Sequence, residues 1–243
     1  MKTALISDIH GNHVALNTVL NDLETQKPDK LICLGDVATI GPQPAQVLDT
    51  LLTLDCVFIQ GNHDIAMLHP QKANDYKIHP DLHENLYWTI DQTTPQHKAF
   101  LESFQFSFSM DLEPHINLLC FHASPKSNID VILPSTPYSI LDDLFADTTA
   151  DIMAGGHTHR QMLRKFHDRL IVNPGSVGTS FATPPPNNLP MLSPWVEYTI
   201  IETIAGSVQV SFHRLPMDVP AVLEAVRQSH MPNSAWWLRQ YQT

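Results

Sequence analysis

The N-terminal part of the chain contains one stretch that organises the rest, Leu5-Ile6-Ser7-Asp8-Ile9-His10-Gly11-Asn12. A short apolar run there ends in a carboxylate and, two residues later, an imidazole. Residues two apart in a strand point to the same side, so Asp8 and His10 can face one object together. We interpret that object as a metal ion. Because Asp-x-His is common by chance, the interpretation depends on further ligands elsewhere in the chain.

Strands and helices alternate after this stretch. Short apolar runs predict buried strands at residues 2–7, 31–34 and 56–59. Helical periodicity predicts one helix from an Asn12 cap to just before Pro28, and a second over residues 44–54. This order predicts a parallel sheet with helical crossovers, in which ligands bind beyond the carboxyl ends of the strands.

Each of these strands ends in residues that can bind a metal ion. Asp8 and His10 follow the first strand, Gly35-Asp36 follows the second, and Gly61-Asn62-His63-Asp64 follows the third. One Gly-Asp turn is usually structural. Three successive strand ends with such groups favour a shared metal site at this edge of the sheet.

Two later strands carry histidines in the same position. The apolar run at residues 116–121 is followed by His122, and the run at 152–154 is followed by Gly155-Gly156-His157-Thr158-His159. The two glycines permit close approach of the backbone. His157 and His159 can then converge as Asp8 and His10 do.

The remaining segments predict supporting elements. Residues 65 to about 110, with helical segments over 82–90 and 95–104, are expected to form a helical cap beside the site, where substrate choice resides. A helix is expected over 137–145 and a hairpin over 162–166 and 169–172. Residues 183–194 are proline-rich and predict an exposed loop. Alternating patterns at 196–200 and 208–212 predict a hairpin of a second sheet.

The C-terminal region predicts one more helix, capped by Asp218. The aromatic tail around Trp236-Trp237 is expected to pack on the core, with docking on a second subunit as the alternative. The sequence leaves the oligomeric state open, a homo-oligomer included.

The composition restricts the class of protein. The 243 residues suffice for one large domain, and we expect a single domain over residues 1–243. A net charge of −11 argues against stable nucleic-acid binding, whereas 14 histidines beside 14 Lys and Arg residues favour metal binding. Cys33, Cys56 and Cys120 lie in or beside apolar runs and are expected to be reduced thiols. Without a signal peptide or a long apolar run, we expect a cytoplasmic protein that does not enter membranes.

Collected in chain order, the motifs are Asp8-x-His10, Gly35-Asp36, Gly61-Asn62-His63-Asp64, His122 and Gly156-His157-Thr158-His159. This order resembles the calcineurin-like metallophosphoesterases, whose signature is D-x-H, G-D, G-N-H-[DE], H and G-H-x-H. The resemblance runs from Lys2 to about Val177. Gly41-Pro42-x-Pro44 and the run from Asn173 to Gly178 resemble the small bacterial and archaeal phosphodiesterase-like branch. The resemblance implies an α/β fold, a four-layer αββα sandwich of two mixed sheets flanked by helices.

The resemblance also implies a ligand set for two metal ions. Asp8, His10, Asp36 and His159 would hold one ion. Asp36, Asn62, His122 and His157 would hold the other, with the Asp36 carboxylate bridging. In two-metal hydrolytic sites the ions lie roughly 3.5–4 Å apart and share a hydroxide that attacks phosphorus. Mixed imidazole, carboxylate and amide ligands suit Mn, Fe, Zn, Co or Ni, with Mn favoured here.

His63 is left over from the ligand set. Its role in the family is to donate a proton to the leaving oxygen or a hydrogen bond to the phosphate, and an imidazole suits both. Asn62 lies beside it as a further substrate contact. Asp64 is expected to orient His63, with a helix N-terminal cap as the alternative. Arg160, directly after His159, is another candidate for substrate contact.

Two departures from the family pattern bear on the substrate. The family's protein phosphatases commonly carry an Arg shortly after Gly-Asp and another after Gly-Asn-His-Glu, and neither is present here. Without guanidinium groups to bind a dianionic monoester, a singly charged diester is favoured. We therefore expect a phosphodiesterase for a small or nucleotide diester. The alternatives are a phosphomonoesterase such as a protein phosphatase, a dinucleoside-polyphosphate hydrolase, or a non-catalytic scaffold that binds a partner.

Overall fold

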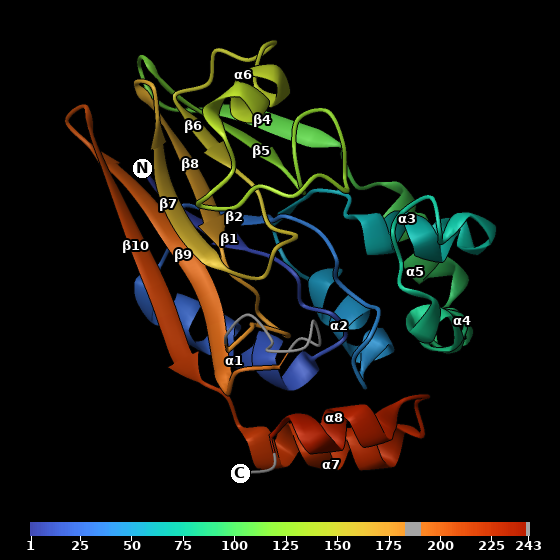
Figure 1. Cartoon of the computed structure of the whole chain (residues 1–243). Coiled ribbons are helices and arrows are strands. Elements are labelled where there is room, and N and C mark those ends of the chain that lie inside the picture. The colour runs from blue at the N-terminus through green and yellow to red at the C-terminus, as the bar shows by residue number, and fades with distance from the viewer. Residues whose placement is uncertain (183–190, 242–243) are drawn as a thin grey trace.

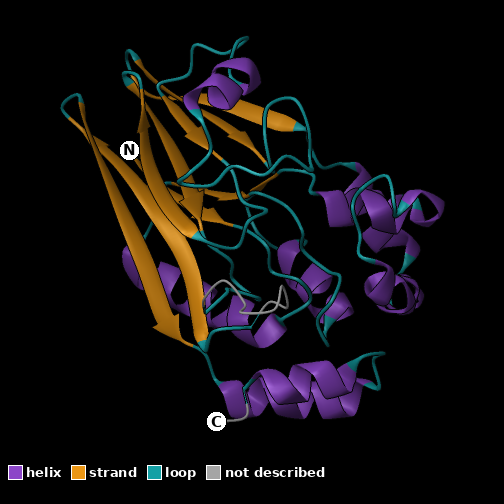
Figure 2. Ribbon diagram, in the orientation of Figure 1, coloured by secondary structure: helices purple, strands orange, loops and turns teal. Residues whose placement is uncertain are grey.

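The protein is described by a computed structural model that covers residues 1–182 and 191–241. Two five-stranded sheets are stacked face to face and helices lie outside them (Figures 1 and 2). Most of the predicted proline-rich loop, residues 183–190, lies outside the described residues.

The first sheet has the strand order β10-β9-β1-β2-β3. Its central strands β1 (Lys2–Ile6), β2 (Lys30–Cys33) and β3 (Val57–Phe58) are parallel, as predicted. The crossovers are helices α1 (His13–Gln26) and α2 (Pro44–Leu51). The predicted cap of α1 is confirmed, because the Asn12 side chain accepts the N–H of Ala15.

The C-terminal hairpin belongs to this same sheet, and its assignment to a second sheet was wrong. Strands β9 (Trp195–Ile204) and β10 (Ser207–Pro216) form the hairpin, and β9 pairs antiparallel with β1. Alternation of apolar and polar residues predicts a strand but not its neighbour. The free edge of β1 is the physical reason for the placement, since its backbone groups need partners.

The second sheet has the order β4-β5-β6-β8-β7. Strands β5 (Ile116–Phe121), β6 (Ile152–Ala154) and β8 (Arg169–Pro174) are parallel. Strands β4 (Ser107–Glu113) and β7 (Gln161–Phe166) pair antiparallel at the two edges. The sequence patterns located four of these strands and missed β4, whose residues alternate between exposed and half-buried along most of its length.

Three apolar layers hold the sandwich together. Side chains of both sheets, among them Leu5, Ile32 and Leu118, form the layer between the sheets. A second layer lies between the first sheet and the helices outside it, which include α1, α2, α7 (Val219–Ser229) and α8 (Ser234–Gln240). Helix α6 (Tyr138–Leu144) covers the second sheet (Figure 1). The predicted four-layer αββα arrangement is thus confirmed.

The segment predicted as a helical cap contains most of the other helices. These are α3 (Asn62–Leu68), the 3-10 turns η1 (Pro70–Lys72) and η2 (Pro80–Leu82), α4 (His83–Asp91) and α5 (Pro95–Glu102). Figure 1 shows them grouped to one side of the sheets. None of the helices in the described ranges has both the length and the apolar content needed to cross a membrane.

The aromatic tail packs on the core, as predicted. Trp237 of α8 is almost fully buried, and its indole N–H donates a hydrogen bond to the backbone oxygen of Ile40 at 3.1 Å. The Asp218 cap of α7 is also confirmed by its bond to the N–H of Ala221. The three cysteines are free thiols.

Candidate metal centre

The carboxyl ends of strands from both sheets meet at one place, and all seven predicted ligands lie there. They form two groups. The first cluster consists of Asp8, His10 and His159, and the second consists of Asp36, Asn62, His122 and His157. His157 is half-buried, and the other six residues are buried.

The first cluster joins the loop after β1 to the loop after β6. His159 Nε2 lies 3.3 Å from Asp8 Oδ1 and 3.1 Å from His10 Nε2. The two residues that follow the N-terminal strand therefore share one centre with a histidine 149 positions later than His10.

The second cluster is centred on His122. Its Nε2 lies 3.3 Å from Asp36 Oδ2, 3.1 Å from Asn62 Oδ1 and 3.2 Å from His157 Nδ1. The same Asp36 oxygen is 3.9 Å from His10 Nε2 in the first cluster. Asp36 therefore lies between the two clusters, as expected for a bridging carboxylate.

The hydrogen bonds behind these atoms determine their chemistry. His122 Nδ1 lies 2.7 Å from the backbone oxygen of Leu34, and His159 Nδ1 lies 2.8 Å from that of Thr179. A carbonyl only accepts, so each Nδ1 carries a proton, and Nε2 is the ring atom that faces the cluster and can present a lone pair to a cation. Asn62 donates its amide N–H to Tyr76, which turns its Oδ1 toward His122.

Atoms that can serve as metal ligands thus face one another in both clusters. Among the described residues, Asp8 Oδ1 is buried and makes no well-aligned hydrogen bond, and it lies 3.3 Å from His159 Nε2. A buried, unpaired carboxylate oxygen costs free energy unless a cation compensates it. The residues present therefore fit divalent metal ions, and the nitrogen and oxygen donor set suits transition metals.

The charges of the clusters are strongly coupled. Burial lowers the pKa of His122, but the Asp36 carboxylate beside it outweighs burial and raises that pKa to about 10. Burial raises the pKa of Asp8, yet His159 holds it at about 2. The buried carboxylates thus favour positive charge beside them, which a bound cation would supply.

The backbone at the site is strained. Five of the seven predicted ligands have left-handed φ angles between 47° and 65°: Asp8, His10, Asp36, His157 and His159. Each such residue costs about 1–2 kcal/mol relative to ordinary conformations, and such strain gathers at functional sites. Strand β1 ends at Ile6, so Asp8 and His10 converge through these turns and not through a strand pleat. The expectation that a strand aligns them was wrong.

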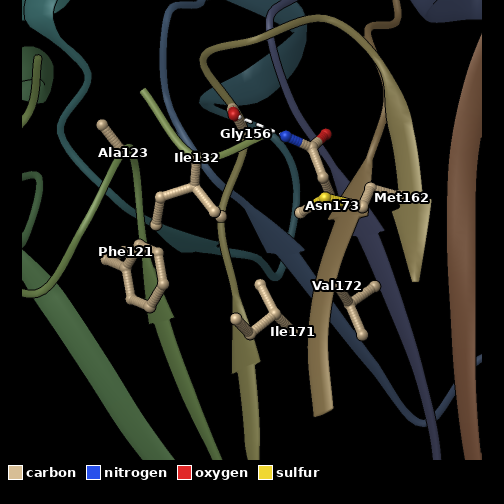
Figure 3. A pocket seen from close by; sticks show the side chains of 9 residues that line it. Phe121, Ala123, Ile132, Gly156, Met162, Ile171, Val172 and Asn173 are labelled. Carbon is tan, nitrogen blue, oxygen red and sulfur yellow. Dashed lines mark hydrogen bonds between the residues drawn. The ribbon is translucent and has the colours of Figure 1, made fainter. Parts of the chain in front are cut away.

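Close backbone approach at Gly155-Gly156, predicted from the sequence, is confirmed at Gly156. A Cβ atom there would collide with Ser7 Oγ and Asp8 Oδ2. Figure 3 shows the Asn173 amide donating to the backbone oxygen of Gly156, a bond of 2.6 Å. The same amide also donates to Thr158 Oγ1 at 3.0 Å. The cavity in that view measures about 10 Å³, room for one water molecule at most.

His63 lies beside both clusters but is not oriented by Asp64. Its Nδ1 is hydrogen-bonded to Thr39 Oγ1 at 2.7 Å, and its backbone N–H donates to Asp36 Oδ1. The Asp64 carboxylate accepts the N–H groups of Asp36, Val37 and Gly61 at 2.8–2.9 Å. The expected orienting role of Asp64 is therefore wrong. The helix-cap alternative describes it, because its carboxylate binds the Gly61 N–H at the start of α3 and also two N–H groups of the loop after β2.

A cavity of about 820 Å³ opens over the clusters. His63 and the cluster residues His10, Asp36, His157 and His159 are among the residues that line it. Arg160 is not among its described lining residues, because the chain turns at the left-handed His159 and enters β7 at Gln161. Asn62 contacts Tyr76 and His122 instead of the cavity. Neither residue is thus placed as a substrate contact.

Sequence reasoning missed several cavity residues. They come from the cap segment and from the C-terminal helix: His79, Asp81, Glu84, Met231, Trp236 and Arg239. No motif marks them, and the Trp236-Trp237 pair was the only local signal. The same reasoning missed Thr39, whose position three residues after Asp36 carries no signal of its own.

Comparisons with known proteins agree with this geometry. Residues 1–191 match the calcineurin-like phosphoesterase superfamily domain. The chain belongs to this family. Its members generally bind divalent metal ions and the family name denotes phosphoester hydrolysis, which agrees with the two clusters.

Individual relatives support the fold. The metallophosphoesterase from Sphaerobacter thermophilus is 24% identical with a TM-score of 0.74, covering 99% of this chain and 98% of that one. The hypothetical protein PH1004 from Pyrococcus horikoshii OT3 is 18% identical with a TM-score of 0.80, covering 96% and 94%. The uncharacterized protein MJ0912 of Methanocaldococcus jannaschii is 27% identical over 176 residues, which are 72% of this chain and 69% of the relative.

Proposed function

We propose that the protein is a dinuclear, metal-dependent phosphodiesterase that hydrolyses a small or nucleotide phosphodiester. The observation that carries this proposal is the position of Asp36 Oδ2, which lies 3.3 Å from His122 Nε2 and 3.9 Å from His10 Nε2. One carboxylate between two sets of nitrogen and oxygen donors suits a pair of cations. Manganese is the favoured ion.

Bound divalent ions would polarise the phosphoryl oxygens and lower the pKa of an attacking water. The protein's own part is to hold the donors in place before substrate arrives. The carbonyls of Leu34 and Thr179 hold the protons of His122 and His159 away from the site. The N–H groups of His63 and His157 hold the carboxylates of Asp36 and Asp8.

His63 is the residue that we assign to the leaving group. Thr39 binds its Nδ1, which leaves Nε2 as the ring nitrogen that can give a proton to the leaving oxygen. General acid catalysis of this kind contributes about 10²–10⁴-fold to a rate. His63 touches the substrate in this assignment, and Thr39 acts through it.

The small number of Lys and Arg side chains in the cavity favours a diester over a monoester as the substrate. Arg239 is the only Lys or Arg among the described residues that line the cavity, and it is exposed on the C-terminal helix. A monoester dianion is usually bound by guanidinium groups close to the metals. A scaffold that only binds a partner does not require the buried cluster of Asp8, His10 and His159.

The test compares bis(p-nitrophenyl) phosphate with p-nitrophenyl phosphate as substrates of the manganese-loaded protein, together with the metal content per chain. We expect two ions per chain and faster hydrolysis of the diester. A preference for the monoester of tenfold or more would reject the diesterase, and turnover with one ion per chain would reject the dinuclear centre.

A further inference from the structure

The cavity extends well beyond the metal-facing residues. A volume of about 820 Å³ is in the range of sites for drug-sized ligands, roughly 300–1,000 Å³. A phosphate group and two ions fill a small part of that space. The rest of the cavity must therefore suit whatever group the phosphoester carries.

The part of the cavity lining that continues from the clusters is apolar and aromatic. We call it the far wall and define it by Phe181, Leu192, Met231, Trp236 and Trp237. Phe181 stacks on His159 with ring centroids 4.7 Å apart and 19° between the planes. The far wall therefore begins directly at a predicted metal ligand.

Hydrogen bonds hold the far wall in a fixed position. Trp237 donates to the Ile40 oxygen, and the Asn85 side chain accepts the N–H of Ile40 at 2.8 Å. Asn233 donates to the backbone oxygen of Asp81 at 2.7 Å, which ties the start of α8 to η2. A wall fixed before binding loses little conformational entropy when a ligand arrives.

Trp236 is the aromatic residue of the C-terminal helix that keeps part of its ring exposed. It is half-buried, and its ring packs edge-to-face on the buried Trp237 with centroids 5.8 Å apart and 88° between the planes. Part of the Trp236 indole thus remains open where it lines the cavity. Tryptophan offers a large, rigid surface for stacking of flat rings.

The charges at the cavity rim favour a neutral group on the ligand. Asp81 and Glu84 bring two exposed carboxylates, against the one guanidinium of Arg239 and the imidazole of His79. A second phosphate at this end would meet net repulsion. This argues for a ring without further negative charge and against a polyphosphate chain.

We propose that the far wall binds a flat aromatic group of the ester, of the nucleobase or aryl class, by stacking on Trp236. Substrate selection then rests largely on the C-terminal helix α8, and the cap segment contributes only the rim. This inference rests on the proposed function, because it assigns the group carried by the phosphoester that the clusters bind.

The experiment compares two ligands that share a ribose and a methyl phosphodiester and differ only in the base, adenosine 5′-(methyl phosphate) and ribose 5-(methyl phosphate). Their Kd values are measured by titration calorimetry on the manganese-loaded protein. We expect the wild type to bind the adenosine ligand about tenfold or more tightly, the usual effect of stacking one base on an aromatic side chain. Trp236→Leu is expected to reduce this ratio to about twofold, and Trp236→Phe to keep most of it.

Trp195→Leu is the matched control, because Trp195 is 38% exposed and is not among the lining residues. Its ratio should equal that of the wild type. Equal Kd values for the two ligands in the wild type, an unchanged ratio in Trp236→Leu, or absence of binding by both ligands would overturn the proposal. The two hypotheses fail separately: diester hydrolysis with equal Kd values rejects only the stacking site, and base-dependent binding without diester hydrolysis rejects only the reaction.

Discussion

The two ends of the cavity differ in almost every physical respect. The metal-facing end is buried and polar, its backbone is strained at five positions, and its residues follow the strands of both sheets. The far wall is apolar, and most of it comes from the C-terminal segment after residue 191. The family match covers residues 1–191 and so includes the first end and little of the second.

This difference indicates that catalysis and substrate selection depend on different parts of the cavity. A metal site needs donors within tenths of an ångström, and rigid strand ends supply that precision. A stacking surface needs only a flat apolar area at the right place, which a helix added after the last strand can supply. Changes at the metal-facing end should therefore affect turnover, whereas changes at the far wall should affect which ligand binds.

The largest effect is expected at Asp36. Asp36→Asn removes the charge between the two clusters, and we expect metal-dependent turnover to fall by at least about 1,000-fold, with loss of bound metal. Rates and metal content per chain are measured together. Asp55→Asn, at an exposed carboxylate that precedes β3 and lies away from the clusters, is the control. Retained activity with two bound ions would show that Asp36 is not the bridge.

Substitution of His63 should lower the catalytic rate without changing metal binding. His63→Ala is expected to lower kcat by about 100-fold or more, with metal content unchanged, because the ring is assigned to proton transfer. Thr39→Val removes the hydrogen-bond partner of the His63 ring and should lower kcat less than His63→Ala does, by about tenfold. His69→Ala, at an exposed histidine, is the control. If His63→Ala lost both ions, His63 would have to be a ligand.

Substitution of Asp64 should lower the stability of the protein, whereas substitution of His63 should lower the catalytic rate. Asp64→Asn leaves buried backbone N–H groups without a full set of acceptors, and we expect about 3 kcal/mol of destabilisation in urea unfolding. His63→Ala should unfold within about 1 kcal/mol of the wild type, as expected for a change that breaks no buried backbone contact. Equal stability of Asp64→Asn and the wild type would contradict the capping role.

The metal-facing end was predictable because each of its motifs is local. Asp8, Asp36 and His122 each follow an apolar run, and parallel strands bring such ends together. Their left-handed backbones were not predictable, because tertiary contacts impose that strain. The pairing of β9 with β1 was missed for a related reason: a strand pattern does not name its partner.

The far wall was not predictable in the same way. Met231 and Trp236 have no pattern beyond that of an amphipathic helix, and their function depends on where α8 docks. That docking depends on single contacts between distant residues, such as Trp237 to Ile40, which are 197 positions apart. The helical cap was expected to control substrate choice, but in the structure it shares the cavity with the C-terminal helix.

The smallest effect is expected where the two ends meet, at Ile40. This β-branched residue has a φ of 79° and lies four positions after Asp36, and Asn85 holds its peptide groups on both sides. Asn85→Ala frees that loop, so we expect KM for a nucleotide diester to rise about threefold, while kcat and metal content stay within about twofold. Asn74→Ala, at an exposed position of the same cap segment, is the control. A fall in kcat with loss of metal in Asn85→Ala would mean that the Ile40 loop supports the metal-facing end, and the division between chemistry and selection would then not hold at this loop.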